Sequence, residues 1–242
     1  AVREGKPVLI EKPLATTGAD ARAMVTAANQ AHVILMTAQT LRFDPAILLL
    51  KEQLQTIGSL RSGTLTMHNE TKANVIPGTS GQIPLGALLE LGIHLLDLVR
   101  FLTGDEIRKV QCTMTPDPSK APETRVQAQL HTTGGVTCSL DIARVESLRV
   151  GTAEWVGTSG TVTADWPRRR VTRTDTHGTS KAWTVEPCQT VLAMLQAFVQ
   201  AIWTSKPPPI TGLDGCRAVE AADACYRSAA LGGLWVDVES PI

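Results

Sequence analysis

Residues 5–14 of the chain, GKPVLIEKPL, place a short apolar run directly before a lysine that lies between a glutamate and a proline. The run predicts a buried strand at residues 7–10 that delivers Lys12 to its carboxyl end. In an open α/β sheet, ligands bind in the crevice beyond the carboxyl ends of the strands, so Lys12 is a candidate functional residue. The alternative is a solvated lysine in a surface loop, which is the ordinary place for this residue type.

Residues 85–104 predict a helix that carries Glu90, His94 and Asp97. Their spacing of i, i+4 and i+7 places the three side chains on one face, within roughly 60° of one another. A histidine can accept a proton at neutral pH, and a carboxylate one turn away can orient its ring and stabilise its cation. Apolar residues surround the three almost continuously, which indicates a buried helix. Buried charges are costly, so their presence indicates a functional or structural role. The alternative is an ordinary surface network.

A strand at residues 7–10, a helix at 17–31 and a strand at 33–37 are expected to form one βαβ unit, the repeating element of nucleotide-binding folds. The pattern changes after a helix at 45–54. Alternating apolar and polar residues, joined in several places by short glycine-bearing turns, then predict a series of strands. These strands are expected at 61–68, 110–114, 125–131, 136–142, 149–156 and 161–165.

Two further helices, at residues 190–203 and 214–231, are expected to close the chain. The predicted fold class is therefore α/β plus α+β. A partial Rossmann segment of βαβ type is followed by a domain with a large, mostly antiparallel open sheet that is flanked by helices.

The composition excludes several classes of function. Lysine plus arginine and aspartate plus glutamate both number 23, so no net field favours nucleic acid or an anionic membrane. Five cysteines without a C-x-x-C pair favour reduced thiols in a cytoplasmic protein over disulfides or structural zinc. No apolar run approaches the ~20 residues that a membrane-spanning helix needs. We therefore expect a globular cytoplasmic protein with no nucleic-acid or membrane partner.

Three runs resemble, in order and spacing, the Gfo/Idh/MocA family of nicotinamide-dependent oxidoreductases. They are EKP at 11–13, QTLRFDP at 39–45 and ELGIHLLD at 90–97. The segment 210–229 resembles the closing helix of that family, so the resemblance covers essentially the whole chain. It implies hydride transfer between NAD or NADP and a secondary alcohol or carbonyl of a sugar, a polyol or a related small molecule.

The resemblance also implies catalytic roles. Lys12 would bridge the cofactor ribose and the substrate hydroxyl, which lowers the cost of negative charge on the oxygen. His94 would act as general base, a role worth roughly 10²–10⁴ in rate. Glu90 would support these two from a position where the family commonly has an aspartate.

Binding roles follow from the same resemblance. Glu11 and Pro13 would shape the turn beneath the nicotinamide, and Arg42 would complete the cofactor-binding set with Lys12; a structural ion pair is the equal alternative for Arg42. Asp97 also matches a family position and would bind the substrate together with Lys12 and His94. The alternative is a structural role, in which Asp97 orders the helix or a neighbouring arginine. The chain would form a homo-oligomer through its open sheet.

Two features depart from the family pattern. The family opens with a G-x-G-x-x-G turn, and none of the 19 glycines here has that spacing. The chain begins AVREG, like the last turn of a helix closed by glycine. We therefore expect residues 1–44 to be the remnant of a dinucleotide-binding domain that lacks its amino-terminal part, either because the chain is a fragment or because it is an unusual shortened member of the family. Residues 45–242 would form the substrate and oligomerisation domain, with closing helices that pack back on the first.

Other functions stay open. An NAD-dependent glycosidase of the same fold would use the nicotinamide transiently, and a sensor or scaffold would have lost cofactor binding. A metal-assisted hydrolase or lyase using Glu90, His94 and Asp97 is disfavoured because residues so spaced on one helix spread over ~10 Å, so no metal site is expected. Residues 69–85 lack periodicity and predict either a substrate-covering loop or an ordinary connection.

Overall fold

The computed structural model describes residues 1–70, 85–119, 121–145 and 147–239. The predicted substrate-covering loop falls almost entirely on residues 71–84, which lie outside these ranges.

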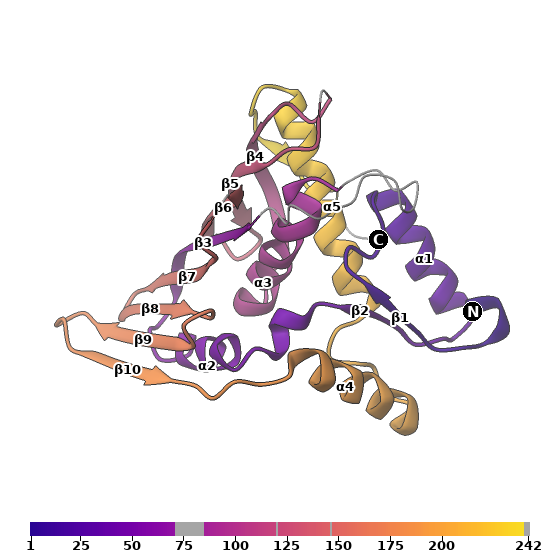
Figure 1. The fold of residues 1–242 in the computed structure, drawn as a ribbon, viewed down its shortest axis with the longest axis horizontal. Helices are drawn as coiled ribbons and strands as arrows, with labels where there is room; N and C mark the ends of the chain where they lie inside the picture. The colour runs from indigo at the N-terminus through magenta and orange to yellow at the C-terminus, as the bar shows by residue number, and fades with distance from the viewer. Residues whose placement is uncertain (71–84, 120, 146, 240–242) are drawn as a thin grey trace.

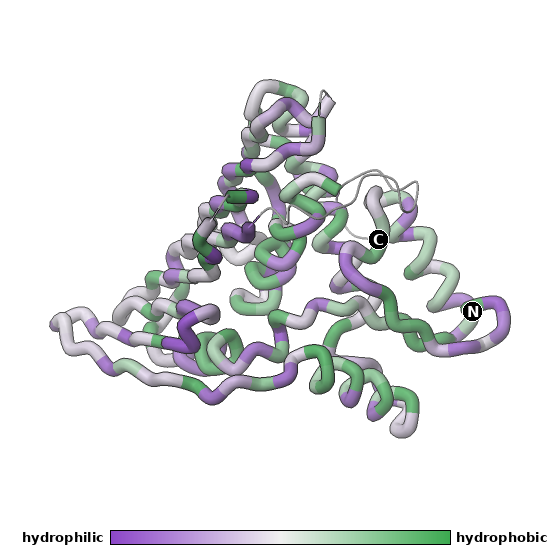
Figure 2. The backbone as a smooth tube through the Cα atoms, viewed as in Figure 1, coloured by the Kyte–Doolittle hydropathy of each residue, from purple (hydrophilic) through white to green (hydrophobic). Residues whose placement is uncertain are grey.

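The first region is a βαβ unit, as the sequence predicts. Strands β1 (Val8–Glu11) and β2 (Leu35–Ala38) pair in parallel, and helix α1 (Gly18–Gln30) connects them. Figure 2 shows the two strands as a largely hydrophobic stretch beside the polar turn near the amino terminus. Because Glu11 is opposite Ala38, the residues that follow both strands leave the sheet at the same carboxyl edge.

The second region is one large sheet, which in the described part of the chain has nine strands in the order β10-β9-β8-β7-β3-β6-β5-β4-β11. The pair β3–β6 is parallel and every other pair is antiparallel, which confirms the mostly antiparallel prediction. The strands are β3 (Leu60–Glu70), β4 (Ile107–Thr115), β5 (Arg125–Thr132), β6 (Thr137–Val145), β7 (Val150–Gly157), β8 (Gly160–Asp165), β9 (Arg170–Asp175), β10 (Ser180–Thr184) and β11 (Val236–Asp237).

Helices cover one face of this sheet. Figure 1 shows α2 (Pro45–Leu54), α3 (Ile93–Thr103) and α5 (Gly212–Ala230) on the side that faces the βαβ unit. Along β5, buried residues alternate with exposed ones, so the covered face forms the core and the opposite face is open. Helix α4 (Thr190–Thr204) lies beside the smaller sheet, where Met194 packs with Met36 of β2.

Helix α5 joins the two regions, because it packs against β4 and α3 on one side and against α1 and β2 on the other. Its first turn comes very close to β2: a side chain at Gly215 would collide with Thr37, and one at Gly212 would collide with Leu35. The two glycines therefore allow the start of the helix to pack directly against the strand.

The helix predicted over residues 85–104 differs from the expectation in its first turns. A π-helical turn spans Leu88–Gly92, and regular α-helix begins only at Ile93. The start of the segment is fixed from outside: Glu123, from the connection before β5, accepts hydrogen bonds from the backbone of residues 87 and 88, the second at 2.9 Å through its carboxylate. Gly86 has no room for a Cβ beside that carboxylate. No helix among the described residues has the length and apolar content needed to cross a membrane.

Candidate active site

Lys12 follows β1 and reaches the π-helical turn. Its Nζ donates a hydrogen bond to the backbone carbonyl of Glu90 at 2.5 Å, although the two residues are far apart in sequence. The side chain is half-buried, and burial lowers the pKa of Lys12 more than the nearby Glu90 and Glu11 carboxylates raise it. The amine is therefore held close to the segment that carries the other candidate residues.

His94 lies one turn after Glu90 and is buried, with 8% of its surface exposed. Its Nδ1 is 2.9 Å from Oε1 of Gln39, the residue that follows β2. Burial lowers the pKa of His94 to about 3, and the positive charge of Lys12 acts in the same direction. The imidazole is therefore neutral at neutral pH, with a lone pair on one ring nitrogen.

Glu90 presents its backbone and its side chain to different partners. Its carbonyl accepts the bond from Lys12, and its carboxylate pairs with the guanidinium of Arg144, at the end of β6. The same Arg144 nitrogen donates to the carbonyl of Leu85 at 2.6 Å. Because 48% of the Glu90 side chain is exposed, this ion pair is open to solvent.

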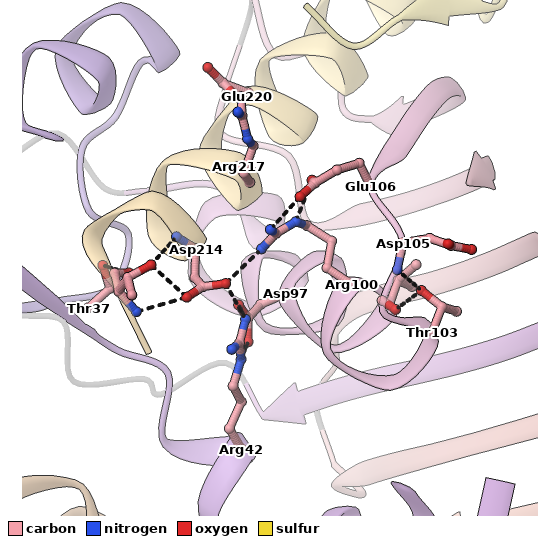
Figure 3. Close-up of polar contacts among 12 residues, drawn as sticks. Thr37, Arg42, Asp97, Arg100, Thr103, Asp105, Glu106, Asp214, Arg217 and Glu220 are labelled. Carbon is pink, nitrogen blue, oxygen red and sulfur yellow. Dashed lines mark hydrogen bonds and ion pairs between the residues drawn. The ribbon is translucent and has the colours of Figure 1, made fainter. Parts of the chain in front are cut away.

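Asp97 lies two turns further along and belongs to a buried ionic network, which Figure 3 shows. Arg42 donates through Nε and Nη2 to the two carboxylate oxygens of Asp97, at 2.7 and 2.6 Å. Asp214, at the start of α5, accepts from both Arg42 and Arg100 at 3.2 Å. Burial lowers the pKa of Arg42, but the Asp97 and Asp214 carboxylates together outweigh it, so the pKa is raised overall. The network therefore ties α3 to α5 and to the turn after β2.

Comparisons with known proteins identify the family. A family model described as the GFO/IDH/MocA C-terminal domain matches residues 47–163. A second model, described as the oxidoreductase family with an NAD-binding Rossmann fold, matches residues 1–39. The chain is 31% identical to inositol 2-dehydrogenase 2 of Saccharopolyspora erythraea, over 96% of this chain and 69% of the relative. The chain belongs to the Gfo/Idh/MocA family of oxidoreductases.

Other members of the Gfo/Idh/MocA family agree with this assignment. D-apiose dehydrogenase of Paraburkholderia graminis is 30% identical over 95% of this chain and 66% of its own length. The solved structure of aldose-aldose oxidoreductase from Caulobacter crescentus, complexed with glycerol, superimposes with a TM-score of 0.83 at 25% identity, covering 98% of this chain and 73% of that one. The chain thus spans about two thirds of the length of these curated relatives, which are sugar and polyol dehydrogenases.

The Gfo/Idh/MocA residues named from the sequence fall into two groups. Lys12, Glu90 and His94 come together where the βαβ unit meets the helix. Arg42 and Asp97 are instead bound to each other in the buried network. This agrees with the alternative given above for both residues, a structural ion pair. Glu11 is exposed, and Pro13 follows Lys12 through a cis peptide bond.

Two residues of the site were missed in the sequence analysis. Gln39 follows β2 as Lys12 follows β1, so the same argument about strand ends could have identified it. Arg144 is the last residue but one of β6, a strand whose alternation gives no sign of function, and only the three-dimensional pairing with Glu90 places it here.

An NAD-type cofactor is implied by the family, and the residues present fit its nicotinamide end. Lys12 and Gln39 project from the carboxyl edge of two parallel strands, which is where dinucleotides bind in such sheets. Gln39 Nε2 is buried and has no hydrogen-bond partner among the described residues, so it is a donor available to a ligand. Among the residues that the structure describes, no group of three or more His, Cys, Asp or Glu is arranged to hold a metal ion.

Proposed function

We propose that the chain carries the catalytic centre of a dehydrogenase that uses NAD or NADP to oxidise a secondary alcohol of a sugar or polyol. The supporting observation is that Lys12 and His94, from distant parts of the sequence, lie at one junction between the two regions. Lys12 contacts the turn that precedes His94, and its charge acts on the His94 ring.

Oxidation of a secondary alcohol removes a hydride from carbon and a proton from oxygen. A bound nicotinamide would supply the acceptor for the hydride. The ammonium group of Lys12 stabilises the negative charge that develops on the substrate oxygen, and the neutral imidazole of His94 takes the proton. Burial opposes the formation of the imidazolium cation, so this transfer depends on the nearby negative charge of the reacting oxygen.

The other predicted residues take supporting roles in this proposal. Glu90 holds Lys12 through its backbone carbonyl while Arg144 holds its carboxylate. Glu11 and Pro13 shape the turn beside the nicotinamide. Asp97 and Arg42 act through their ion pair, which fixes α3 against the turn after β2.

The division into a dinucleotide-binding region at residues 1–44 and a substrate region at 45–242 is part of the same proposal. We also propose self-association through the open face of the large sheet. That face has a hollow lined by polar side chains, among them Thr64, Gln127, Gln129 and Ser139, and helices α2, α3 and α5 lie on the opposite face.

The decisive experiment is an assay of nicotinamide reduction with D-apiose, myo-inositol and related polyols, using NAD and NADP in parallel at millimolar concentration. We expect Lys12→Met and His94→Gln to lower the rate at least ~100-fold. Lys6→Met, at the other end of β1, and His177→Gln, in the exposed turn between β9 and β10, are matched controls that keep the rate. Absence of cofactor reduction with every polyol, or equal loss in the control variants, would contradict the proposal.

A further inference from the structure

We propose that Gln39 is a positioning residue that keeps the proton of neutral His94 on Nδ1 and leaves Nε2 as the atom that accepts the proton of the substrate. The inference rests on the proposed dehydrogenase function and adds to it a residue with two separate tasks. The first is the orientation and tautomer of the imidazole. The second is a hydrogen bond to a ligand oxygen.

Gln39 is placed rigidly enough for the first task. Only 1% of its surface is exposed. Its backbone N–H donates to the carbonyl of Thr37 at 3.0 Å, and its carbonyl accepts from the N–H of Arg42 at 3.1 Å. The side chain therefore starts from a backbone held on both sides, and the hydrogen bond to His94 Nδ1 at 2.9 Å fixes its far end.

The surroundings make Gln39 the group that determines the tautomer. A neutral imidazole has one N–H donor and one lone pair, and the hydrogen bond of one nitrogen decides the role of the other. Gln39 is the hydrogen-bond partner found for the His94 ring within the described residues. The charged groups nearby have other partners: Lys12 donates to the Glu90 carbonyl, the Glu90 carboxylate binds Arg144, and Asp97 binds Arg42.

The amide nitrogen of Gln39 supports the second task. With Oε1 toward His94, Nε2 is left buried without a partner among the residues that the structure describes. Buried polar groups almost always have hydrogen-bond partners, so an unpaired N–H₂ beside a reactive imidazole indicates a donor meant for a ligand. The ligand chemistry that fits is a hydroxyl or carbonyl oxygen, as on the alcohol substrate, its ketone product or the carboxamide of nicotinamide.

The test is long-range ¹H–¹⁵N NMR of the histidine side chains in the 242-residue protein at pH 7.5 without cofactor. We expect the wild-type His94 signal to be that of the Nδ1–H tautomer. Gln39→Met removes the acceptor and is expected to shift the signal toward the Nε2–H form. Gln39→Glu keeps an acceptor at the same length and is expected to retain Nδ1–H. Gln53→Met, a buried glutamine of α2, is the matched control and is expected to change nothing at His94.

Kinetics separate the two tasks. We expect Gln39→Met to lower kcat at least 10-fold, and Gln39→Glu, which lacks the N–H₂ donor, to raise KM more than it lowers kcat. An Nε2–H signal in the wild type, or an unchanged tautomer in Gln39→Met, would overturn the inference and leave the dehydrogenase proposal standing. An Nδ1–H signal in a protein that reduces no cofactor would instead overturn the function on which the inference rests.

Discussion

Two arginine–carboxylate pairs lie at the two ends of one helical segment and differ in their surroundings. Glu90 in the π-helical turn pairs with Arg144, and the two side chains are 48% and 21% exposed. Asp97 in α3 pairs with Arg42, and these side chains are 1% and 8% exposed. The same chemistry, seven residues apart, thus gives one pair that solvent can reach and one that is part of the core.

The contrast explains how the segment can combine rigidity with reactivity. Buried ions are costly to leave unpaired, so the Asp97 pair and its neighbours Asp214 and Arg100 fix α3 in one position. The exposed pair contributes little to folding and leaves the Glu90 end in contact with solvent. His94 lies between them, buried like Asp97 but facing the Lys12 side.

Removal of the buried carboxylate should have the largest effect. We expect Asp97→Ala to lower the free energy of unfolding by about 3–5 kcal/mol, because it leaves the Arg42 guanidinium buried with Asp214 as its remaining carboxylate partner. Urea denaturation followed by circular dichroism measures this loss. The double variant Arg42→Met with Asp97→Leu is the control, since replacing both charges should recover much of the loss. A single variant that loses less than about 1 kcal/mol would show that the two pairs do not differ as we infer.

His94 should make stability depend on pH, with a smaller effect. Its pKa is lowered to about 3 in the folded protein, from an ordinary 6.5. Below pH 6.5 the unfolded chain takes up a proton that the folded protein excludes, so this contribution is absent above pH 6.5 and destabilises increasingly as the pH falls toward 3. Between pH 7.5 and pH 5 we expect a loss of about 2 kcal/mol in the free energy of unfolding.

Urea denaturation at the two pH values checks this expectation in His94→Gln and in His68→Gln. The first variant should lose most of the pH dependence, although it is less stable overall, and the second should keep it. If His94→Gln shows the same pH dependence as the wild type, the ring is not held neutral by burial.

The main features of the fold followed from hydrophobic periodicity. The βαβ unit and the antiparallel order of the large sheet depend on apolar patterns that the sequence shows directly. Strands β9 and β10 were not delimited in the prediction, because their residues are mostly polar or exposed and give little alternation. The π-helical turn was not predicted, and the contact that anchors its start comes from Glu123, more than thirty positions later in the chain.

In the candidate site, too, the sequence pattern indicated individual residues but not the contacts between residues distant in sequence. Lys12 and His94 were found because a charged residue after a strand and a histidine in an apolar helix are visible in the sequence. The placement of Glu90, Asp97 and His94 on one helical face said nothing of their partners, which come from β6, the turn after β2 and the end of β2. Burial separates their roles, and burial depends on tertiary contacts that spacing does not encode.

The smallest expected effect concerns the exposed pair. Glu90→Gln keeps the backbone carbonyl that holds Lys12 and removes the charge that Arg144 binds, so we expect the free energy of unfolding to change by at most about 1 kcal/mol. Urea denaturation measures it beside Asp97→Asn, which makes the same chemical change in the buried pair. In 0.5 M salt the difference between wild type and Glu90→Gln should shrink, since exposed charges are screened, while that for Asp97→Asn should persist. Equal losses in the two variants, or equal salt dependence, would mean that exposure does not separate the two ends of the segment.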